Sequence, residues 1–87
     1  MNKTVYEKAI DYIKVHGWCQ GNFVNREKQV CLVGALNVVA ETGFEMQNAI
    51  DSLTKKLKIE KGNLAVWNDE VGRTKKDVIN LLEEMQL

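Results

Sequence analysis

The sequence predicts an α+β domain that is mostly helical, with about four helices around a central apolar helix and one small β-hairpin between the first two helices. Two observations carry this prediction. Apolar residues recur at helical spacing in several segments, and one intervening segment reads as two short extended runs around a polar loop. With 87 residues, 45% of them apolar, residues 1–87 are expected to form a single compact domain.

The first helix is expected to begin at Thr4 and to end at Gly17. Thr4 and Glu7 have the spacing of a capping box, in which side chains bond free backbone N–H groups of the first turn. Glycine adopts the left-handed conformation that ends many helices. The residues of its apolar stripe are Tyr6, Ala9, Ile10 and Ile13.

The segment after this helix is expected to contain a turn and then the β-hairpin. Phe23 and Val24 form the first extended run, residues 25–28 the polar loop, and residues 29–32 the second run. A two-stranded hairpin is marginally stable by itself, so it must pack against the helices.

The central helix is expected over residues 32–41, followed by Gly43. Apolar residues cover nearly every direction around it, which is typical of a buried helix. Gly34 inside the helix costs about 1 kcal/mol relative to alanine. Either close packing against a neighbour offsets this cost, or Gly34 marks the junction between strand and helix.

Two further helices follow. The third has a capping pair in Thr42 and Glu45 and is expected to end at Gly62. The last begins at Thr74, and between the two lies a loop in which Asn63 can cap a short turn. The apolar stripes of these helices contain Met46, Ala49, Ile50, Leu53 and Leu57, and then Val78, Leu81, Leu82 and Met85.

The charge balance argues against a nucleic-acid partner. Twelve basic and twelve acidic residues give a net charge of zero, whereas proteins that neutralise phosphates usually carry a basic excess. Four lysines do cluster, and they form either a solvated helix face or the phosphate-binding surface of a nucleic-acid-binding regulator. They are Lys55, Lys56, Lys58 and Lys61.

Composition also bounds the compartment and the cofactors. No secretory signal is evident, and the longest apolar run, residues 30–40, is shorter than the ~20 residues needed to cross a bilayer. We therefore expect a cytoplasmic protein with reduced thiols and no membrane partner. Two cysteines and one histidine cannot complete a four-ligand zinc site, so no metal and no other cofactor is expected.

One catalytic alternative uses Cys19 and His16, with Asn68 or Asp69 to orient the imidazole. A thiol, an imidazole and an amide are the parts of a cysteine-dependent hydrolase or transferase. Against this reading, Cys19 follows a helix C-terminus, where the helix dipole disfavours a thiolate. Cys31 is expected to be a small buried apolar side chain.

The loop before the last helix carries the candidate binding residues. They are Trp67, Asn68, Asp69 and Arg73, with Gln20 from the first turn as a neighbour. Trp67 either anchors a partner or seals the junction between helices. The two Asx side chains either contact a ligand or bond their own backbone. Arg73 either pairs with a nearby carboxylate or presents a recognition surface.

Three blocks of the chain together resemble a known family. They are Gly17-Trp18-Cys19-Gln20-Gly21, Cys31-Leu32-Val33-Gly34-Ala35-Leu36, and Trp67-Asn68-Asp69 followed by Gly72-Arg73-Thr74. Their order is similar to that of an uncharacterised domain-of-unknown-function family of small bacterial and phage proteins with G-W-x-Q-G, C-x-x-G-A-L, W-N-D and R-T blocks. The resemblance covers residues 6–82, and Cys19 falls at the variable position of the first block.

The resemblance implies no established activity, but its phage members imply a class of accessory proteins that bind host machinery. The expected function is therefore a small non-enzymatic protein-binding module, a phage or mobile-element protein that inhibits a host defence complex. The cysteine-dependent enzyme and the nucleic-acid-binding regulator remain alternatives. Pairing of hairpin edges or apolar helix faces would allow a homodimer.

Overall fold

The computed structural model describes residues 3–86, and these residues form five α-helices and no β-strand. The mostly helical prediction is confirmed, and the predicted β-hairpin is wrong. In chain order the elements are α1 (Val5–His16), α2 (Leu32–Val39), α3 (Gly43–Leu57), the 3₁₀ turn η1 (Lys61–Asn63), α4 (Leu64–Asn68) and α5 (Lys75–Glu84).

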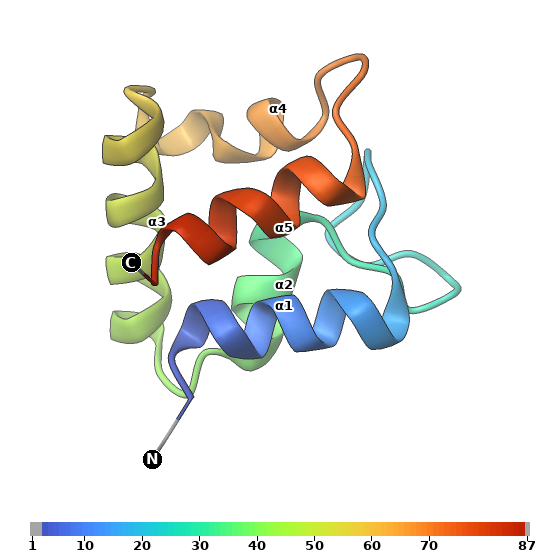
Figure 1. Ribbon diagram of the computed structural model, residues 1–87, viewed down its shortest axis with the longest axis horizontal. Coiled ribbons are helices and arrows are strands. Elements are labelled where there is room, and N and C mark those ends of the chain that lie inside the picture. The colour runs from blue at the N-terminus through green and yellow to red at the C-terminus, as the bar shows by residue number, and fades with distance from the viewer. Residues whose placement is uncertain (1–2, 87) are drawn as a thin grey trace.

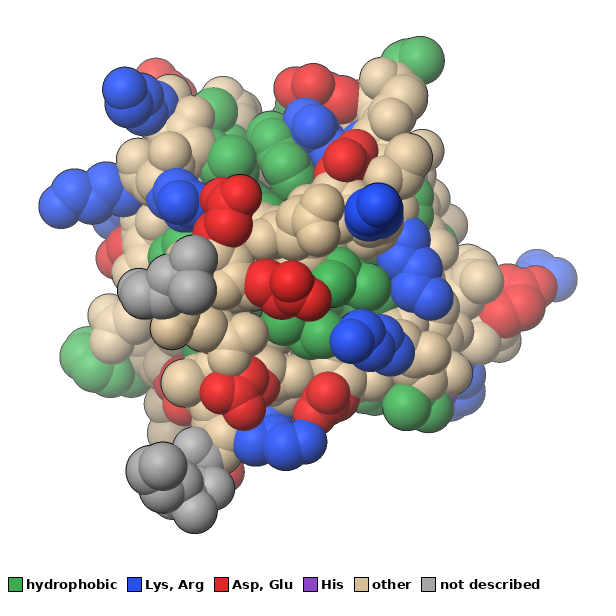
Figure 2. Space-filling model, in the orientation of Figure 1, with side chains coloured by type: hydrophobic (Ala, Val, Ile, Leu, Met, Phe, Trp, Pro, Cys, Tyr) green, Lys and Arg blue, Asp and Glu red, His purple; other side chains and the backbone are tan. Residues whose placement is uncertain are grey.

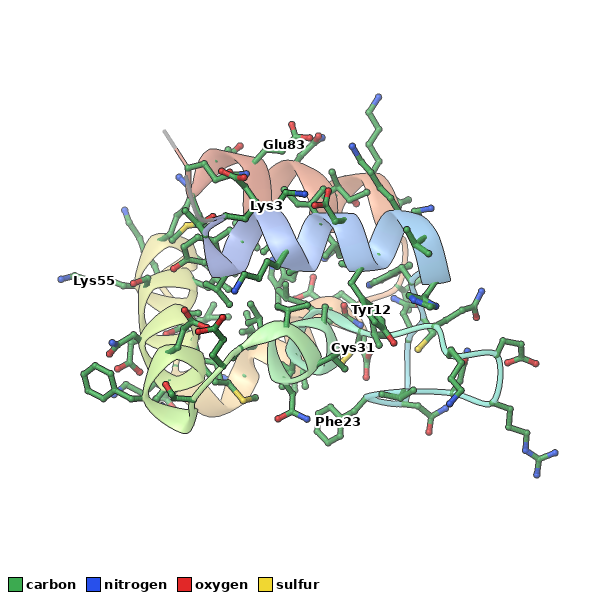
Figure 3. All side chains as sticks on the ribbon, turned by 90° about the horizontal axis from the view of Figure 1, so that it is seen from below. Lys3, Tyr12, Phe23, Cys31, Lys55 and Glu83 are labelled. Atoms are coloured by element: carbon green, nitrogen blue, oxygen red, sulfur yellow. The ribbon has the colours of Figure 1, made fainter. Side chains whose placement is uncertain are left out.

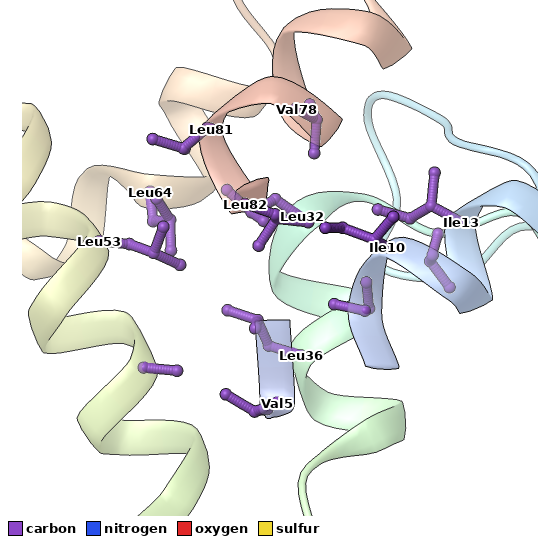
Figure 4. Packing of buried hydrophobic residues seen from close by; sticks show 14 residues of the cluster. Val5, Ile10, Ile13, Leu32, Leu36, Leu53, Leu64, Val78, Leu81 and Leu82 are labelled. Atoms are coloured by element: carbon purple, nitrogen blue, oxygen red, sulfur yellow. The ribbon is translucent and has the colours of Figure 1, made fainter. Parts of the chain in front are cut away.

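The helices pack around α2. Helices α1 and α5 lie side by side, α3 runs across one end of this pair, and α2 contacts α1, α3 and α4 (Figure 1). Leu32 and Leu36 of α2 are fully buried among side chains of the other helices (Figure 4). Other buried members of the same hydrophobic cluster are Ile10, Ile13, Leu53, Leu64, Val78 and Leu82.

The segment expected to form the hairpin is held by single β-bridges. Val30 pairs with Trp18 in the parallel sense and with Val24 in the antiparallel sense, and each pairing is one residue long. The second extended run cannot continue, because Cys31 is already the N-cap of α2 and Leu32 is its first helical residue. The fully buried Val30 is therefore a short central segment between two neighbours rather than one arm of a hairpin.

A side chain builds the loop where the hairpin was expected. Asn25 Oδ1 accepts hydrogen bonds from the backbone N–H groups of Glu27 and Gln29, both at 3.0 Å. Asn25 Nδ2 donates to Gln29 Oε1 at 2.7 Å. Lys28 adopts a positive φ of 69°. The loop is thus closed by asparagine bonds to its own backbone, a common alternative to a strand ladder.

Close packing explains Gly34. A Cβ atom on this residue would lie 2.0 Å from the backbone oxygen of Phe23 and 2.8 Å from its carbonyl carbon. The first turn of α2 therefore rests directly on the backbone of the preceding loop, and only glycine allows this approach. Of the two explanations offered by the sequence, close packing against a neighbour is the correct one.

Several helix ends differ from the expected ones. Gly17 ends α1 with a φ of 98°, as predicted. Gly43, however, is the first residue of α3. Helix α3 ends at Lys58, which adopts the left-handed conformation with φ 58°, and Gly62 lies in η1 instead. The turn expected after Asn63 is the short helix α4.

The three threonine caps are confirmed. The side chains of Thr4 and Thr42 accept hydrogen bonds from the N–H groups of Glu7 and Glu45. Thr74 forms the full reciprocal box: its Oγ1 accepts from Asp77 N–H at 3.1 Å, and Asp77 Oδ2 accepts from Thr74 N–H at 3.0 Å.

Removing the hydroxyl at the start of α5 should weaken the fold measurably. Thr74→Ala is expected to lower the free energy of unfolding by about 1 kcal/mol, because one N–H of the first turn loses its acceptor. Thr74→Ser keeps the acceptor and should remain close to the wild type. Urea denaturation followed by circular dichroism measures both, and equal stabilities of Thr74→Ala and Thr74→Ser would contradict the capping role.

Candidate functional site

The first turn of the chain docks onto α4 and the loop that follows it. Gln20 Nε2 donates to the backbone oxygens of Asn68, at 3.0 Å, and Glu70, at 2.9 Å. The backbone N–H of Gly21 donates to Asp69 Oδ1 at 3.0 Å. The structure therefore brings the predicted binding residues of both segments together, although they are about 50 positions apart in the chain.

Asn68 is fully buried at the centre of this contact. Its Oδ1 accepts from the Trp18 indole Nε1–H at 2.7 Å and from the Leu32 backbone N–H at 2.9 Å. Its Nδ2 donates to the backbone oxygen of Cys19 at 3.2 Å and to Asp69 Oδ1 at 2.9 Å. A side-chain amide offers two donors and two acceptor positions. All four are used within the chain, and none is left for a ligand.

Arg73 and Trp67 form a second local unit. The guanidinium carbon of Arg73 lies 3.9 Å from the centre of the Trp67 ring, within the range of a cation–π contact. Arg73 Nε donates to the Trp67 backbone oxygen at 2.9 Å, and Nη2 donates to Glu70 Oε2 at 3.0 Å. Arg73 thus pairs with Glu70, one of the nearby carboxylates, and pins the loop before α5 against α4.

The thiol and the imidazole of the catalytic alternative have separate partners. Cys19 Sγ lies 3.4 Å from the backbone oxygen of Asn22 and 3.5 Å from that of Gln29. The His16 ring packs instead against the Tyr12 ring, with centroids 4.2 Å apart. Within residues 3–86, no hydrogen bond joins the thiol to the imidazole. Burial raises the pKa of Cys19, which lowers the fraction of nucleophilic thiolate.

Alkylation should report this raised pKa. In a Cys31→Ser variant, Cys19 is expected to react with iodoacetamide at pH 7 more slowly than a free peptide thiol, because less of it is ionised. The same variant unfolded in urea supplies the reference rate. Faster reaction in the folded protein than in urea would contradict the raised pKa of Cys19 and would revive the hypothesis of a cysteine-dependent enzyme.

Two residues of this region have roles that the sequence reading missed. Cys31 is buried, as predicted, but it is also the N-cap of α2, where its Sγ accepts from Gly34 N–H at 3.3 Å. Trp18 supplies one of the four hydrogen bonds of Asn68. An indole N–H in a packed turn needs a hydrogen-bond acceptor. This requirement could have predicted that Trp18 bonds to a buried polar side chain.

The lysine cluster is partly paired with carboxylates. Lys56 Nζ lies 3.4 Å from Glu84 Oε2, and Lys61 Nζ lies 3.1 Å from Asp51 Oδ1. Basic and acidic side chains are interspersed over the face seen in Figure 2. The face seen in Figure 2 therefore shows no broad patch of positive charge of the kind that binds phosphates.

The strongest unpartnered feature is an apolar groove between the loop after α1, α2 and α3. It encloses about 270 Å³ and contains no charged side chain in its lining. Phe23 and Val24 form its outer wall and are 61% and 45% exposed, and Phe23 lies at the edge of the molecule (Figure 3). The lining residues of this apolar groove are Phe23, Val24, Val33, Gly34, Asn37 and Met46.

A second cavity shares Phe23 with the apolar groove. It encloses about 340 Å³. Asp69, which is exposed, supplies the acidic group of its lining, and Cys31 lies at its buried side. Of the predicted binding residues, Asp69 lines this cavity, whereas Trp67 and Arg73 line a separate cavity of about 290 Å³ beside α5.

Two further findings concern metals and membranes. Among residues 3–86, no group of three or more histidine, cysteine, aspartate or glutamate side chains is placed to share a metal ion. No helix in this part of the chain combines the length and the apolar character needed to span a bilayer.

Comparison with known proteins identifies one family. A family model described as a family of unknown function (DUF6197) matches residues 2–86, in agreement with the predicted membership of a family without an established activity. No curated protein and no solved structure matches the chain significantly.

Proposed function

Because the chain belongs to DUF6197, a family of unknown function, we propose its function from its own residues: it is a small non-enzymatic module that binds a protein partner through the apolar groove. One contrast carries the proposal. All four hydrogen-bonding positions of the Asn68 side chain are used within the chain. The large apolar side chain of Phe23, in contrast, is exposed beside a groove.

The shape and chemistry of the groove favour a side-chain anchor over a small molecule. Small-molecule pockets usually enclose about 300–1,000 Å³ and contain several directed polar groups. The apolar groove encloses about 270 Å³, and the amide of Asn37 is the polar side chain in its lining. A groove of this kind suits one or two apolar side chains of a partner, held as hot-spot residues are at protein interfaces.

The exposed residues around the groove add to this argument. Contiguous exposed apolar surface on a small protein commonly marks an interaction site. Val38, on the same helix as the groove residue Gly34 and one turn further along, is 44% exposed. The Asp69 carboxylate, beyond Phe23, supplies a polar group at the rim of the second cavity. An apolar centre with a polar rim is the usual composition of a protein interface.

The test is affinity capture with matched phenylalanine variants. The tagged protein is cross-linked in host cells, and the captured proteins are quantified for wild type, Phe23→Ser and Phe44→Ser. Phe44 is 78% exposed and lies outside the lining of the groove, so it controls for loss of any exposed aromatic residue. The partner should be recovered at wild-type level with Phe44→Ser and fall at least about tenfold with Phe23→Ser, the loss expected when a hot-spot residue is removed.

Two outcomes would overturn the proposal. One is the recovery of no specific protein by the wild type. The other is retention of the partner by Phe23→Ser. A second copy of the chain is the competing occupant of the groove, and sedimentation of the isolated protein tests it. A monomer over the working concentration range leaves the groove free for another protein. A dimer that is lost in Phe23→Ser would assign the groove to self-association.

The finer proposal is that the partner is a host defence complex and that the protein acts in the cytoplasm as a phage or mobile-element inhibitor. The resemblance of the sequence blocks to phage-encoded proteins supports it. Expression in a bacterial strain that carries the defence system should raise the efficiency of plaque formation, and Phe23→Ser should abolish the increase. Unchanged plaque formation with the wild type would reject the inhibitor role without rejecting protein binding.

A further inference from the structure

The two cysteines occupy adjacent positions in the backbone pairing. Trp18 and Val30 form a parallel bridge, and the Cys19 N–H donates to the Val30 oxygen at 3.0 Å. The next residues in this register are Cys19 and Cys31. Paired backbone segments lie about 4.8 Å apart, and the Cα atoms of disulfide-bonded cysteines are usually about 4.4–6.8 Å apart. The bridge itself ends at Trp18 and Val30, but one further step in this register would bring the Cys19 and Cys31 Cα atoms to a separation of this order.

The two thiols differ in their exposure to solvent. Cys31 is only 3% exposed, whereas Cys19 is partly exposed. Burial raises the pKa of Cys19, and the charge of a Cys31 thiolate is the next cause that raises it. A small oxidant can therefore reach the Cys19 thiol before it reaches the Cys31 thiol, which is buried.

We propose that Cys19 and Cys31 form a redox pair that closes to an intramolecular disulfide in the presence of a peroxide. Hydrogen peroxide transfers one oxygen to Cys19, giving a sulfenic acid, and is itself reduced to water. The Cys31 sulfur then attacks the sulfenic sulfur, the S–S bond forms, and the S–O bond breaks. The hydroxyl leaves with the Cys31 proton as a second water, so two thiols and one peroxide give one disulfide and two waters.

The disulfide would change the same surface that forms the groove. Cys31 Sγ would give up its bond to Gly34 N–H, and Cys19 Sγ its contact with the Asn22 oxygen. The new bond would close the loop of residues 19–31, which carries the groove wall of Phe23 and Val24. A redox effect on partner binding rests on the proposed function, but formation of the disulfide does not.

A tryptic map without reductant tests the pair directly. The reduced protein is treated with hydrogen peroxide, quenched by alkylation and digested. Trypsin cleaves after Lys14, Arg26, Lys28 and Lys55, so Cys19 and Cys31 fall on peptides 15–26 and 29–55. The expected product, from monomeric protein, is these two peptides joined and lighter by two hydrogens, separating on treatment with dithiothreitol. Over-oxidised Cys19 with Cys31 still alkylated, or linkage found only in dimers, would overturn the proposal.

Two serine variants separate the steps. With Cys31→Ser, which keeps a capping oxygen at the start of α2, the sulfenic acid on Cys19 should persist and react with dimedone several-fold more than in the wild type. With Cys19→Ser, Cys31 should remain a free thiol under the same peroxide dose. Equal dimedone labelling of Cys31→Ser and wild type would show that Cys31 does not resolve the sulfenic acid, and the proposal would fail even if partner binding were confirmed.

Discussion

Replacing Asn68 with leucine should lower the free energy of unfolding by about 3–5 kcal/mol, because each buried polar group left without a partner costs about 1–3 kcal/mol. Three buried or half-buried groups would lose their bonds: the Trp18 indole N–H, the Leu32 backbone N–H and the Cys19 backbone oxygen. For a domain of this size the total stability is roughly 4–13 kcal/mol. The variant should therefore be partly or wholly unfolded at 37 °C.

Urea denaturation measures the loss of unfolding free energy. It is done at about 10–25 °C, close to the temperature at which many domains are most stable. Asn48→Ala is the matched control, because Asn48 is exposed on α3. It should change stability by no more than about 0.7 kcal/mol, the range of ordinary helix propensities. A loss below about 1 kcal/mol for Asn68→Leu would mean that its four hydrogen bonds contribute little beyond a typical single bond.

Gly34→Ala should destabilise the protein by about 2–3 kcal/mol, although alanine normally stabilises a helix by about 1 kcal/mol relative to glycine. The added methyl would lie 2.0 Å from the Phe23 backbone oxygen, and backbone cannot move aside as a flexible side chain can. Either the loop carrying Phe23 must shift or the first turn of α2 must unwind. Both changes would also disturb the apolar groove.

Gly43→Ala provides the opposite case within the same chain. Gly43 is the first residue of α3, and a Cβ atom there meets nothing within 4 Å. The substitution should leave stability unchanged or raise it by up to about 1 kcal/mol. Thermal and urea unfolding of the two variants side by side give the comparison. If both alanines stabilise the protein, then α2 does not rest on the Phe23 backbone as described.

The starts of α1, α3 and α5 could be predicted because their determinants are local. The capping threonines Thr4, Thr42 and Thr74 act on residues three positions away, and the apolar stripes repeat within one helix. The end of α3 was missed since Lys58 adopts a left-handed conformation that glycine would adopt more readily. No sequence pattern makes a lysine at this position stand out, so the nearest glycine, Gly62, was chosen instead.

The β-hairpin was wrongly predicted for a different reason. Residues 30–33, which join the second extended run to the start of α2, are apolar without interruption, and composition alone cannot show where an extended run becomes a helix. The thiol of Cys31 marks that point by capping α2, but cysteine is rarely expected as a cap. The loop is closed by the Asn25 side chain together with the backbone bond from Asn25 N–H to the Gln29 oxygen, and a single antiparallel bridge, Val24 to Val30, takes the place of two strands.

The candidate binding residues were expected to lie near one another, as the structure shows, but the bonds that each of them makes could not be predicted from the sequence. Gln20, Asn68, Asp69 and Arg73 do lie in one region, and each bonds to another part of the same chain. Partners up to 50 positions apart are set by tertiary packing, which no local pattern encodes. The exposure of Phe23 has the same origin, because it depends on how the loop lies against α2.

The bond between Asn68 and the Leu32 amide also bears on how the protein opens. Helix α4 has five residues, and a helix this short has little stability apart from its surroundings. If α4 detached alone, the N-terminus of α2 would lose an acceptor at a fully buried site. Partial opening is therefore disfavoured, and unfolding should be cooperative. The Leu32 amide proton should exchange with solvent only through global unfolding, so its exchange rate alone would measure the stability of the whole domain.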